Sequence, residues 1–279
     1  MEHRSQPWDL GIGVAGYVWP APAPRAALLL QHGLGEYAER YVAGYSGLIP
    51  RLLEAGVSVY AFDLLGHGRS PGRRTVTDIR GAVAHHLAAR RRLRDQPLPV
   101  FLLGHSLGGL VTAASVAADG GGVAGVVLSS AALLVDANLP TRLIGTALAP
   151  LLPNLPARAA LDAAGISRLA DEVERFTTDP LITHGPVRLL LGTTTVRVAR
   201  AAWAQYGRWT VPTLLIHGTA DVFTDPEGSR RFFAAIASED KTLHLVEGGF
   251  HELLNDADRD ETLGVVLDWL EARLPPRPA

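Results

Sequence analysis

The pentapeptide Gly104-His105-Ser106-Leu107-Gly108 carries the clearest chemical signal in the chain, because it fits the pattern G-x-S-x-G. It lies between an apolar, strand-like run and a helix-like stretch. A sharp turn at this place forces the serine into an unfavourable backbone conformation, and the two outer glycines leave room for it. The free N–H groups at the start of the following helix favour developing negative charge. A plain helix N-cap is the alternative role of Ser106, but the strand and helix around it favour a nucleophile.

A serine nucleophile needs a general base, and ten histidines compete for that role. His217 ends one strand-like run and His244 lies within another, so packing explains both. His85 and His86 fall within a helical stretch. His251 differs, because it follows two glycines in the loop after the last strand-like run and precedes another helix. That loop lies at the carboxyl edge of the predicted sheet, where a base can reach the serine, so we predict that His251 is the base.

Two aspartates in the stretch "HGTADVFTDP" compete to orient that base. Asp225 precedes Pro226 and is typical of a helix N-cap with proline at the first helical position. Asp221 lies directly after a strand-like run, in a loop that can face the site. Because the capping role already explains Asp225, we predict that Asp221 is the acid of a catalytic triad.

The oxyanion of a tetrahedral intermediate needs two backbone donors. We expect one to be the N–H of Leu107, which follows the nucleophile, and the other the N–H of Leu34, in the loop after an earlier strand. An ordinary glycine turn is the alternative for that loop. Glu36 and Arg40 are four residues apart in the same stretch, so a local ion pair is expected there.

Strands and helices that alternate along the chain would position these groups. The apolar runs contain little polar alternation, which is typical of parallel strands buried on both faces. Helix-like stretches separate them, around residues 40–55, 77–94 and 107–119, and a last helix is expected near 261–273. The pattern predicts an α/β fold with a mostly parallel sheet flanked by helices on both faces. The predicted strands are 26–33, 57–63, 99–106, 123–130, 211–218 and 241–249.

The alternation fails between residues 131 and 206, where several prolines and helical apolar spacing occur. We therefore expect residues 1–130 and 207–279 to form the core and residues 131–206 to form an inserted helical cap. The apolar residues of the uncharged run 143–153 leave three roles open. The first role is to pack on the sheet as core residues. The second is to bury an alkyl chain of a substrate, which stabilises its binding by about 0.8 kcal/mol per CH₂, and the third is to rest on a lipid surface.

Composition excludes several classes of function. Charged residues make up 19% of the chain and the formal net charge is -2, so no nucleic-acid surface is expected. The basic run 89–94 falls at a predicted helix end and is expected to be a solvated face. The chain has no cysteine, which excludes a thiol nucleophile and cysteine-ligated metals. The first ten residues lack the apolar core of a signal peptide and no apolar run would span a bilayer, so a cytoplasmic location is expected.

Six blocks of the sequence, taken together, resemble the monoacylglycerol lipase and lysophospholipase group of α/β-hydrolases, which some schemes class with serine aminopeptidase-like hydrolases. The order Ser106, Asp221, His251 also matches the order expected of an α/β-hydrolase. The resemblance covers nearly the whole chain, and its specificity comes from the joint occurrence of the blocks. They are "QHGLGEYAERY", "DLLGHGRS", "GHSLGG", "TTDPLITHG", "HGTADVFTDPEGSRRFF" and "GGFHELLND".

The resemblance implies an α/β-hydrolase fold and a serine carboxylester hydrolase that releases a fatty acid from a monoacylglycerol or a similar lipid ester. It supports Ser106, Asp221 and His251 as the triad and Leu34 and Leu107 as oxyanion donors. It also implies that the insertion is a cap with an apolar acyl channel. No cofactor or metal is expected, transient contact of the cap with a membrane surface is allowed, and the oligomeric state stays open.

Alternative activities on the same scaffold are a lysophospholipase, a general carboxylesterase, or an aminopeptidase or amidase. The last needs acidic residues in the cap to bind a substrate ammonium. Asp171, Glu172 and Glu174 are available, but their spacing is typical of a solvated helix face.

The chain departs from the family in two places. Tyr37 stands where histidine is common, and Leu64-Leu65 replaces a more polar pair. Neither change affects the predicted triad, but both argue against transferring the family's head-group contacts in detail. In the same region, Asp63, Gly66 and Gly68 are expected to shape a turn.

Overall fold

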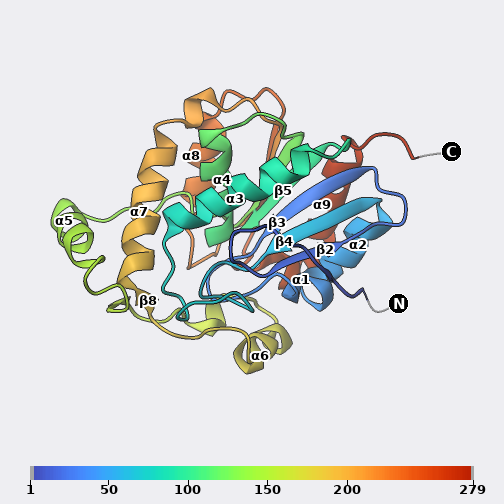
Figure 1. Ribbon diagram of the computed structural model, residues 1–279. Helices are drawn as coiled ribbons and strands as arrows, with labels where there is room; N and C mark the ends of the chain where they lie inside the picture. Colours follow the sequence, from blue (N-terminus) through green and yellow to red (C-terminus); the bar gives the residue numbers. More distant parts are fainter. Residues whose placement is uncertain (1–2, 278–279) are drawn as a thin grey trace.

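The central sheet of the computed structural model, which describes residues 3–277, has eight strands in the order β1-β2-β4-β3-β5-β6-β9-β10 (Figure 1). Six neighbouring strands run parallel to one another, namely β4, β3, β5, β6, β9 and β10. In contrast, β2 pairs antiparallel with β4, and β1 pairs antiparallel with β2. The mostly parallel sheet predicted from the sequence is therefore confirmed. The strands are β1 Gln6–Pro7, β2 Gly16–Trp19, β3 Ala26–Gln31, β4 Val57–Phe62, β5 Val100–His105, β6 Gly125–Ser129, β9 Thr213–Gly218 and β10 Lys241–Val246.

Alternate side chains of each inner strand enter two separate apolar clusters, one on each face of the sheet. In β3, for example, Leu29 enters one cluster, whereas Leu28 and Leu30 enter the other. Every residue of β3, β5, β6 and β9 is buried. This burial on both faces explains why these strands read as unbroken apolar runs.

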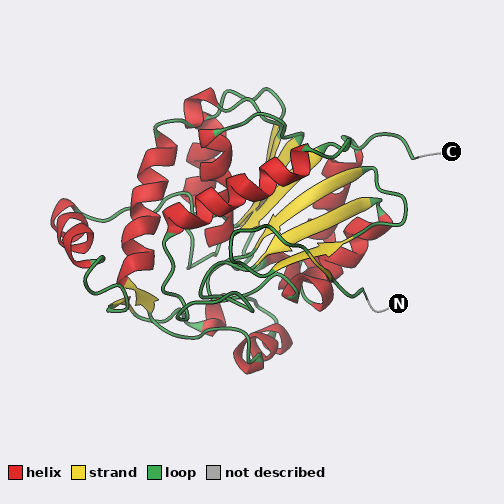
Figure 2. Cartoon of the chain, viewed as in Figure 1, coloured by secondary structure: helices red, strands yellow, loops and turns green. Residues whose placement is uncertain are grey.

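Two sets of helices cover these clusters (Figure 2). The cluster that contains Leu29 is covered by four helices, and the cluster that contains Leu28 by three. The first set is α3 Ile79–Arg94, α4 Leu107–Ala118, α7 Leu189–Trp203 and α8 Pro226–Ala235. The second set is α1 Arg40–Ala43, α2 Leu48–Glu54 and α9 Arg259–Glu271.

The helix expected over residues 40–55 is interrupted. A 3₁₀ turn, Tyr45–Gly47, separates α1 from α2, and Tyr45 and Ser46 both have positive φ angles. Asn255 accepts a hydrogen bond from the Tyr45 backbone N–H, and Leu254 accepts one from the Ser46 hydroxyl. A tertiary contact with the loop before α9 therefore sets this break.

The inserted segment, residues 131–206, leaves the sheet after β6 and returns before β9, and these two strands are neighbours in the sheet. Its helix α7 packs on α3 and α4, while the rest of the segment extends away from the sheet (Figure 1). Among residues 3–277, no helix combines the length and the apolarity needed to cross a membrane. The elements of the segment before α7 are α5 Leu139–Leu148, β7 Pro156–Arg158, the 3₁₀ turn Ala163–Gly165, α6 Ala170–Thr178 and β8 Val187–Arg188.

The structure overturns one expectation about solvation and excludes one of the three roles left open for the run 143–153. The basic run 89–94 is not simply a solvated face, because Arg90 is 1% exposed and donates hydrogen bonds to the carbonyl oxygens of Ser115 and Asp119. The leucines of run 143–153 are not core residues of the sheet, since Leu143 is 63% exposed and Leu151 is 76% exposed.

Candidate active site

Ser106 lies at the sharp turn between β5 and α4, with φ 53° and ψ −120°. Its side chain makes no capping hydrogen bond, so the N-cap alternative does not describe it. A Cβ atom on Gly108 would lie 2.3 Å from the carbonyl oxygens of Gln31 and His32, and one on Gly104 would lie 2.6 Å from the carbonyl oxygen of Gly108. Glycine is therefore required at both positions for this turn to approach β3 and α4 so closely.

His251 and Asp221 lie beside this serine, in the loops after β10 and β9. The Nε2 atom of His251 is 2.9 Å from the Ser106 Oγ, and its Nδ1 atom is 2.7 Å from the Asp221 Oδ2. Because a carboxylate only accepts, Nδ1 carries the proton and Nε2 accepts the serine O–H. All three residues follow parallel strands, so one edge of the sheet brings them together. Asp225 instead caps α8 and accepts the N–H of Glu227, as predicted.

The carboxylate of Asp221 is ionised within a largely buried site. Burial alone would raise the pKa of this carboxyl, but the charge on His251 and hydrogen bonds from His217, His251 and Thr224 hold it well below its usual range. The backbone N–H groups of Phe223 and Thr224 donate hydrogen bonds to the Oδ1 atom of Asp221. This carboxylate therefore stays ionised throughout the neutral pH range, where it can stabilise positive charge that develops on His251 during a reaction.

His105 packs against the imidazole of His251, with ring centroids 4.9 Å apart, and against the Tyr45 ring at 5.5 Å. Burial, together with the charge on His251, lowers the pKa of His105 to about 4. A neutral His105 supports the His251 ring by contact without competing for its proton.

A buried ionic cluster holds the loop after β3. The Glu36 carboxylate accepts the Gly33 backbone N–H at 2.6 Å and a hydrogen bond from Arg40 at 3.0 Å, which confirms the expected local pair. Burial would raise the pKa of Glu36, but Arg40, His105 and His32 lower it to about 2. Arg40 also binds both carboxylate oxygens of Glu252, the neighbour of His251. Sequence reasoning missed Glu252, because its partner lies 212 residues away.

Leu34 and Leu107, the two predicted oxyanion donors, both line the cavity into which Ser106 opens. A Cβ atom on Gly33 would lie 3.1 Å from the Ser106 Cβ, so the loop after β3 runs directly against the serine turn. The turn and this loop together can surround a carbonyl oxygen at Ser106.

The cavity has a volume of about 720 Å³ and extends from Ser106 between α5 and α7. Its walls are mainly apolar and include Leu143, Val187, Leu191 and Phe223. A space of this size and lining suits the alkyl chain of an acyl group.

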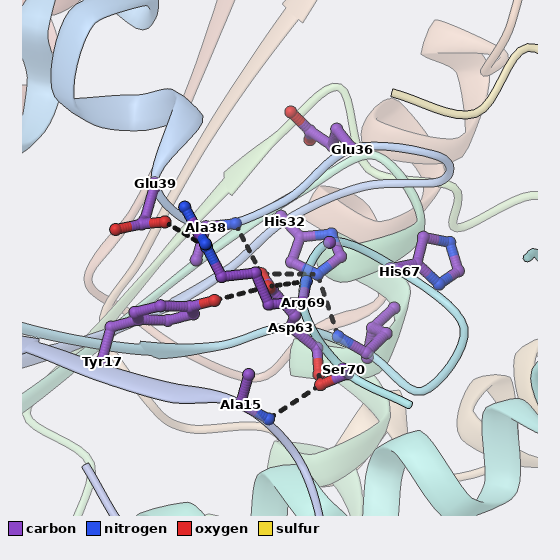
Figure 3. A network of polar contacts seen from close by, with 12 residues as sticks. Ala15, Tyr17, His32, Glu36, Ala38, Glu39, Asp63, His67, Arg69 and Ser70 are labelled. Carbon is purple, nitrogen blue, oxygen red and sulfur yellow. Dashed lines mark hydrogen bonds and ion pairs between the residues drawn. The ribbon is translucent and has the colours of Figure 1, made fainter. Parts of the chain in front are cut away.

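The turn after β4 is organised around Asp63, whose polar contacts are drawn in Figure 3 and whose side chain is fully buried. Its carboxylate accepts the Tyr17 hydroxyl and the backbone N–H groups of Ala38 and Arg69, each at 2.8 Å. A Cβ atom on Gly68 would lie 2.2 Å from this carboxylate. The predicted turn-forming role of Asp63 is therefore confirmed, and the same group fixes the chain near the loop after β3.

Two contacts of the inserted segment involve residues singled out in the sequence. Tyr37 donates a hydrogen bond to Asp179 at the end of α6, which ties the inserted segment to the loop after β3. Glu172 is 6% exposed and pairs with Arg175 and Arg259, so its expected solvated position is wrong. Within residues 3–277, no cluster of three or more histidine, aspartate or glutamate side chains is arranged to hold a metal ion.

The chain resembles known proteins over most of its length. The family described as "Serine aminopeptidase, S33" matches residues 22–258. Monoglyceride lipase of Homo sapiens is 33% identical over 246 residues, which are 85% of this chain and 78% of that protein. Monoacylglycerol lipase of Mycolicibacterium smegmatis is 32% identical over 95% of both chains. The crystal structure of Paleococcus ferrophilus monoacylglycerol lipase has a TM-score of 0.84 at 34% identity and covers 93% of this chain and 99% of that chain.

Proposed function

The chain belongs to the serine aminopeptidase S33 family and is a monoacylglycerol lipase-like carboxylester hydrolase, and from this premise we propose that Ser106, His251 and Asp221 cleave the ester of a monoacylglycerol. The observation that carries the proposal is the unbroken contact from Asp221 through His251 to Ser106, where the serine opens into an apolar cavity. The names of the relatives support this substrate class, since several are monoglyceride or monoacylglycerol lipases.

The reaction proceeds in two halves. His251 takes the Ser106 proton as the serine oxygen attacks the ester carbonyl, and the N–H groups of Leu34 and Leu107 bind the resulting oxyanion. His251 then gives its proton to the leaving glycerol oxygen, which leaves an acyl-enzyme. A water molecule repeats the sequence, with His251 again as base, and releases the fatty acid. Asp221 holds the imidazolium in both halves.

The inserted segment acts as a cap that selects the substrate. The acyl chain lies in the cavity between α5 and α7, where each buried CH₂ contributes about 0.8 kcal/mol. The only acid among the described residues of the cavity wall, Asp136, is already paired with Arg200, and Glu172 is paired elsewhere. A free anchor for the ammonium of an aminopeptidase substrate is therefore not present in this part of the chain, which favours an ester over an aminoacyl amide.

Exposed apolar side chains of the cap contact the lipid surface from which substrate enters. Seven of the nine large apolar residues that are exposed within residues 3–277 lie between Leu139 and Leu161. Exposed apolar groups gathered in this way are typical of a site that meets another apolar phase.

A hydrolysis panel tests the proposal. We expect monoacylglycerols to be cleaved faster than diacylglycerols, lysophospholipids, short p-nitrophenyl esters and aminoacyl amides. A fluorophosphonate should label Ser106, and S106A should lose both labelling and several orders of magnitude in kcat, since triad residues act as a unit. A preference for amides, or near-normal turnover by a folded S106A variant, would overturn the proposal.

A further inference from the structure

Arginines gather where the cavity meets the surface of the cap. Arg142 of α5, Arg158 of β7, and Arg197 and Arg200 of α7 all line the cavity wall. Arg200 pairs with Asp136 at 3.2 Å. In the part of the chain that the structure describes, the other three have no acidic partner within 4.0 Å. These four arginines face a single acid among the described residues of the cavity wall, Asp136, whose pKa is lowered by a backbone hydrogen bond and by the charges of both Arg200 and Arg142, so the rim of the apolar cavity carries a net positive charge.

Exposed leucine and isoleucine side chains lie next to these arginines. Leu143 and Ile144 follow Arg142 in α5 and are 63% and 59% exposed, and Leu151 is 76% exposed just beyond the helix. A site for a small soluble anion would need only the arginines and would have no use for exposed apolar side chains beside them. A surface that offers both apolar side chains and cations matches a lipid layer with acidic head groups.

We propose that this rim, made of Arg142, Arg158 and Arg197 with the neighbouring apolar residues, docks the cap on a lipid surface that carries negative charge. The inference rests on the proposed function, because it identifies the kind of surface from which the ester is drawn. The charge complementarity between the protein and the lipid surface is confined to this rim. The whole chain has a formal net charge of -2, so its overall charge does not attract it to an anionic surface. Docking by this rim would place the cavity mouth against the lipid.

Vesicle sedimentation with the inactive S106A chain tests docking apart from hydrolysis. We expect the chain to bind phosphatidylcholine vesicles that contain about 30% phosphatidylglycerol more tightly than pure phosphatidylcholine vesicles, with binding that weakens as salt increases. Adding R142Q, R158Q and R197Q should lower the partition coefficient on the order of 100-fold, at roughly fivefold per cation. R51Q, R208Q and R230Q make the same charge change on other elements and should lower it far less.

Equal binding to both kinds of vesicle, or equal loss in the two triple variants, would overturn the proposal. Hydrolysis of dissolved esters by the chain that retains Ser106 reports separately on the proposed function. Charge-dependent binding without ester hydrolysis would contradict the proposed function alone, and hydrolysis without charge-dependent binding would contradict the docking alone.

A different observation concerns a second imidazole on Asp221. His217 is fully buried at the end of β9, and its Nε2 atom lies 3.3 Å from the Asp221 Oδ2 and 3.2 Å from the carbonyl oxygen of Thr224. Both neighbours only accept, so Nε2 carries the proton. The Nδ1 atom then accepts the hydroxyl of Ser229, 2.7 Å away. Ser229 of α8 thus selects the tautomer of His217 that donates toward the triad acid.

We infer that His217 and Ser229 are positioning residues that hold the Asp221 carboxylate for His251. H217Q keeps a side-chain N–H and should retain most of kcat, whereas H217F fills the space without a donor and should lower kcat at least tenfold with KM little changed. S229A should fall between them, because the tautomer is no longer selected.

The buried pair His86 and Ser115, whose Nδ1 and Oγ atoms are 2.8 Å apart, provides the matched control. His86 lies in α3 and its hydrogen bonds join it to Thr112 and Ser115 of α4, away from the triad. H86F and S115A should change the free energy of unfolding, but the kcat of each variant should equal that of the parent chain. If H217Q and H217F lose kcat equally, or if kcat follows unfolding free energy in both pairs alike, His217 is only a packing residue and the inference fails.

Discussion

Arg40 donates two hydrogen bonds to the Glu252 carboxylate, at 2.6 and 2.8 Å, and so joins the loop after β3 to the residue beside His251. The pair is buried, and Glu36 accepts a third hydrogen bond from the same guanidinium. R40Q would leave two buried carboxylates without their cation. We expect it to lower the free energy of unfolding by about 3–5 kcal/mol and to lower kcat, because both loops flank Ser106.

Urea denaturation measures the first effect, and R51Q is its control. Arg51 pairs with Glu54 at 3.3 Å, but both side chains are more than half exposed. Loss of that pair should change stability by less than about 1 kcal/mol. An R40Q variant as stable as R51Q would show that the buried cluster does not hold the two loops.

Gly108 separates the start of α4 from the end of β3. Because a Cβ atom there would lie 2.3 Å from two backbone carbonyl oxygens, G108A should displace the serine turn and lower both stability and kcat. We expect a loss of about 1–3 kcal/mol, measured by thermal and urea unfolding. Gly81 lies in α3, and a Cβ atom on it would meet no other atom within 4 Å, so G81A should stabilise the chain by about 0.5–1 kcal/mol. Similar effects of the two changes would contradict the close approach at Gly108.

Gly192 of α7 lines the acyl cavity, and a Cβ atom there would make only ordinary contact with Val187. G192L should therefore be accommodated by the helix but should shorten the cavity. If G192L excludes two CH₂ groups of a long acyl chain from the cavity, and each contributes about 0.8 kcal/mol when buried, kcat/KM for that ester should fall roughly 15-fold. Acetyl and butyryl esters should change little. Gly264 of α9 has open space around it, and G264L is the control that should leave the chain-length profile unaltered.

His86 should make the fold sensitive to mild acid. Burial lowers the pKa of His86 to about 3, against an ordinary value of about 6.5. Between these two values the unfolded chain binds a proton that the folded chain does not, so stability is full above pH 6.5 and is lost as the pH falls toward 3. Each such group contributes a slope of about 1.4 kcal/mol per pH unit.

Urea denaturation between pH 7 and pH 4 checks this expectation. H86F should make the free energy of unfolding depend less steeply on pH, by the amount that corresponds to at most one bound proton. Replacement of His3, a half-buried histidine near the start of the chain, controls for the loss of a histidine as such. An unchanged slope in H86F would show that His86 is protonated in the folded chain.

The parallel part of the sheet could be predicted because β3, β5, β6 and β9 are buried on both faces and therefore have continuous apolar sequences. The antiparallel strands β1 and β2 could not. Gln6–Pro7 is short and exposed, and Gly16–Trp19 is only four residues long, so neither has enough residues for a periodic pattern. They are strands because β4 offers a free edge, which is a tertiary effect.

The predicted site residues were found from their places after strands, since Ser106, Asp221 and His251 each follow a parallel strand. Residues that contact a triad residue or its neighbour, without touching the substrate, were not predicted. Glu252 pairs with Arg40 across 212 residues, and His217 has the ordinary appearance of a residue at a strand end. Partners brought together only by the folded topology leave no local pattern in a sequence.

The adjacency of β6 and β9 has an evolutionary consequence. The segment between them leaves and re-enters the fold through two hydrogen-bonded neighbours, with Ser129 opposite Ile216, so its two ends stay together whatever its length. Each doubling of a closed segment costs only about 0.6 kcal/mol of loop entropy. Apart from α7 and the parts that bond to the core, such as Glu172 with Arg259 and Asp179 with Tyr37, this region can be lengthened, shortened or replaced with little effect on sheet register. New substrate ranges can arise there while the chemical groups remain where the parallel strands place them.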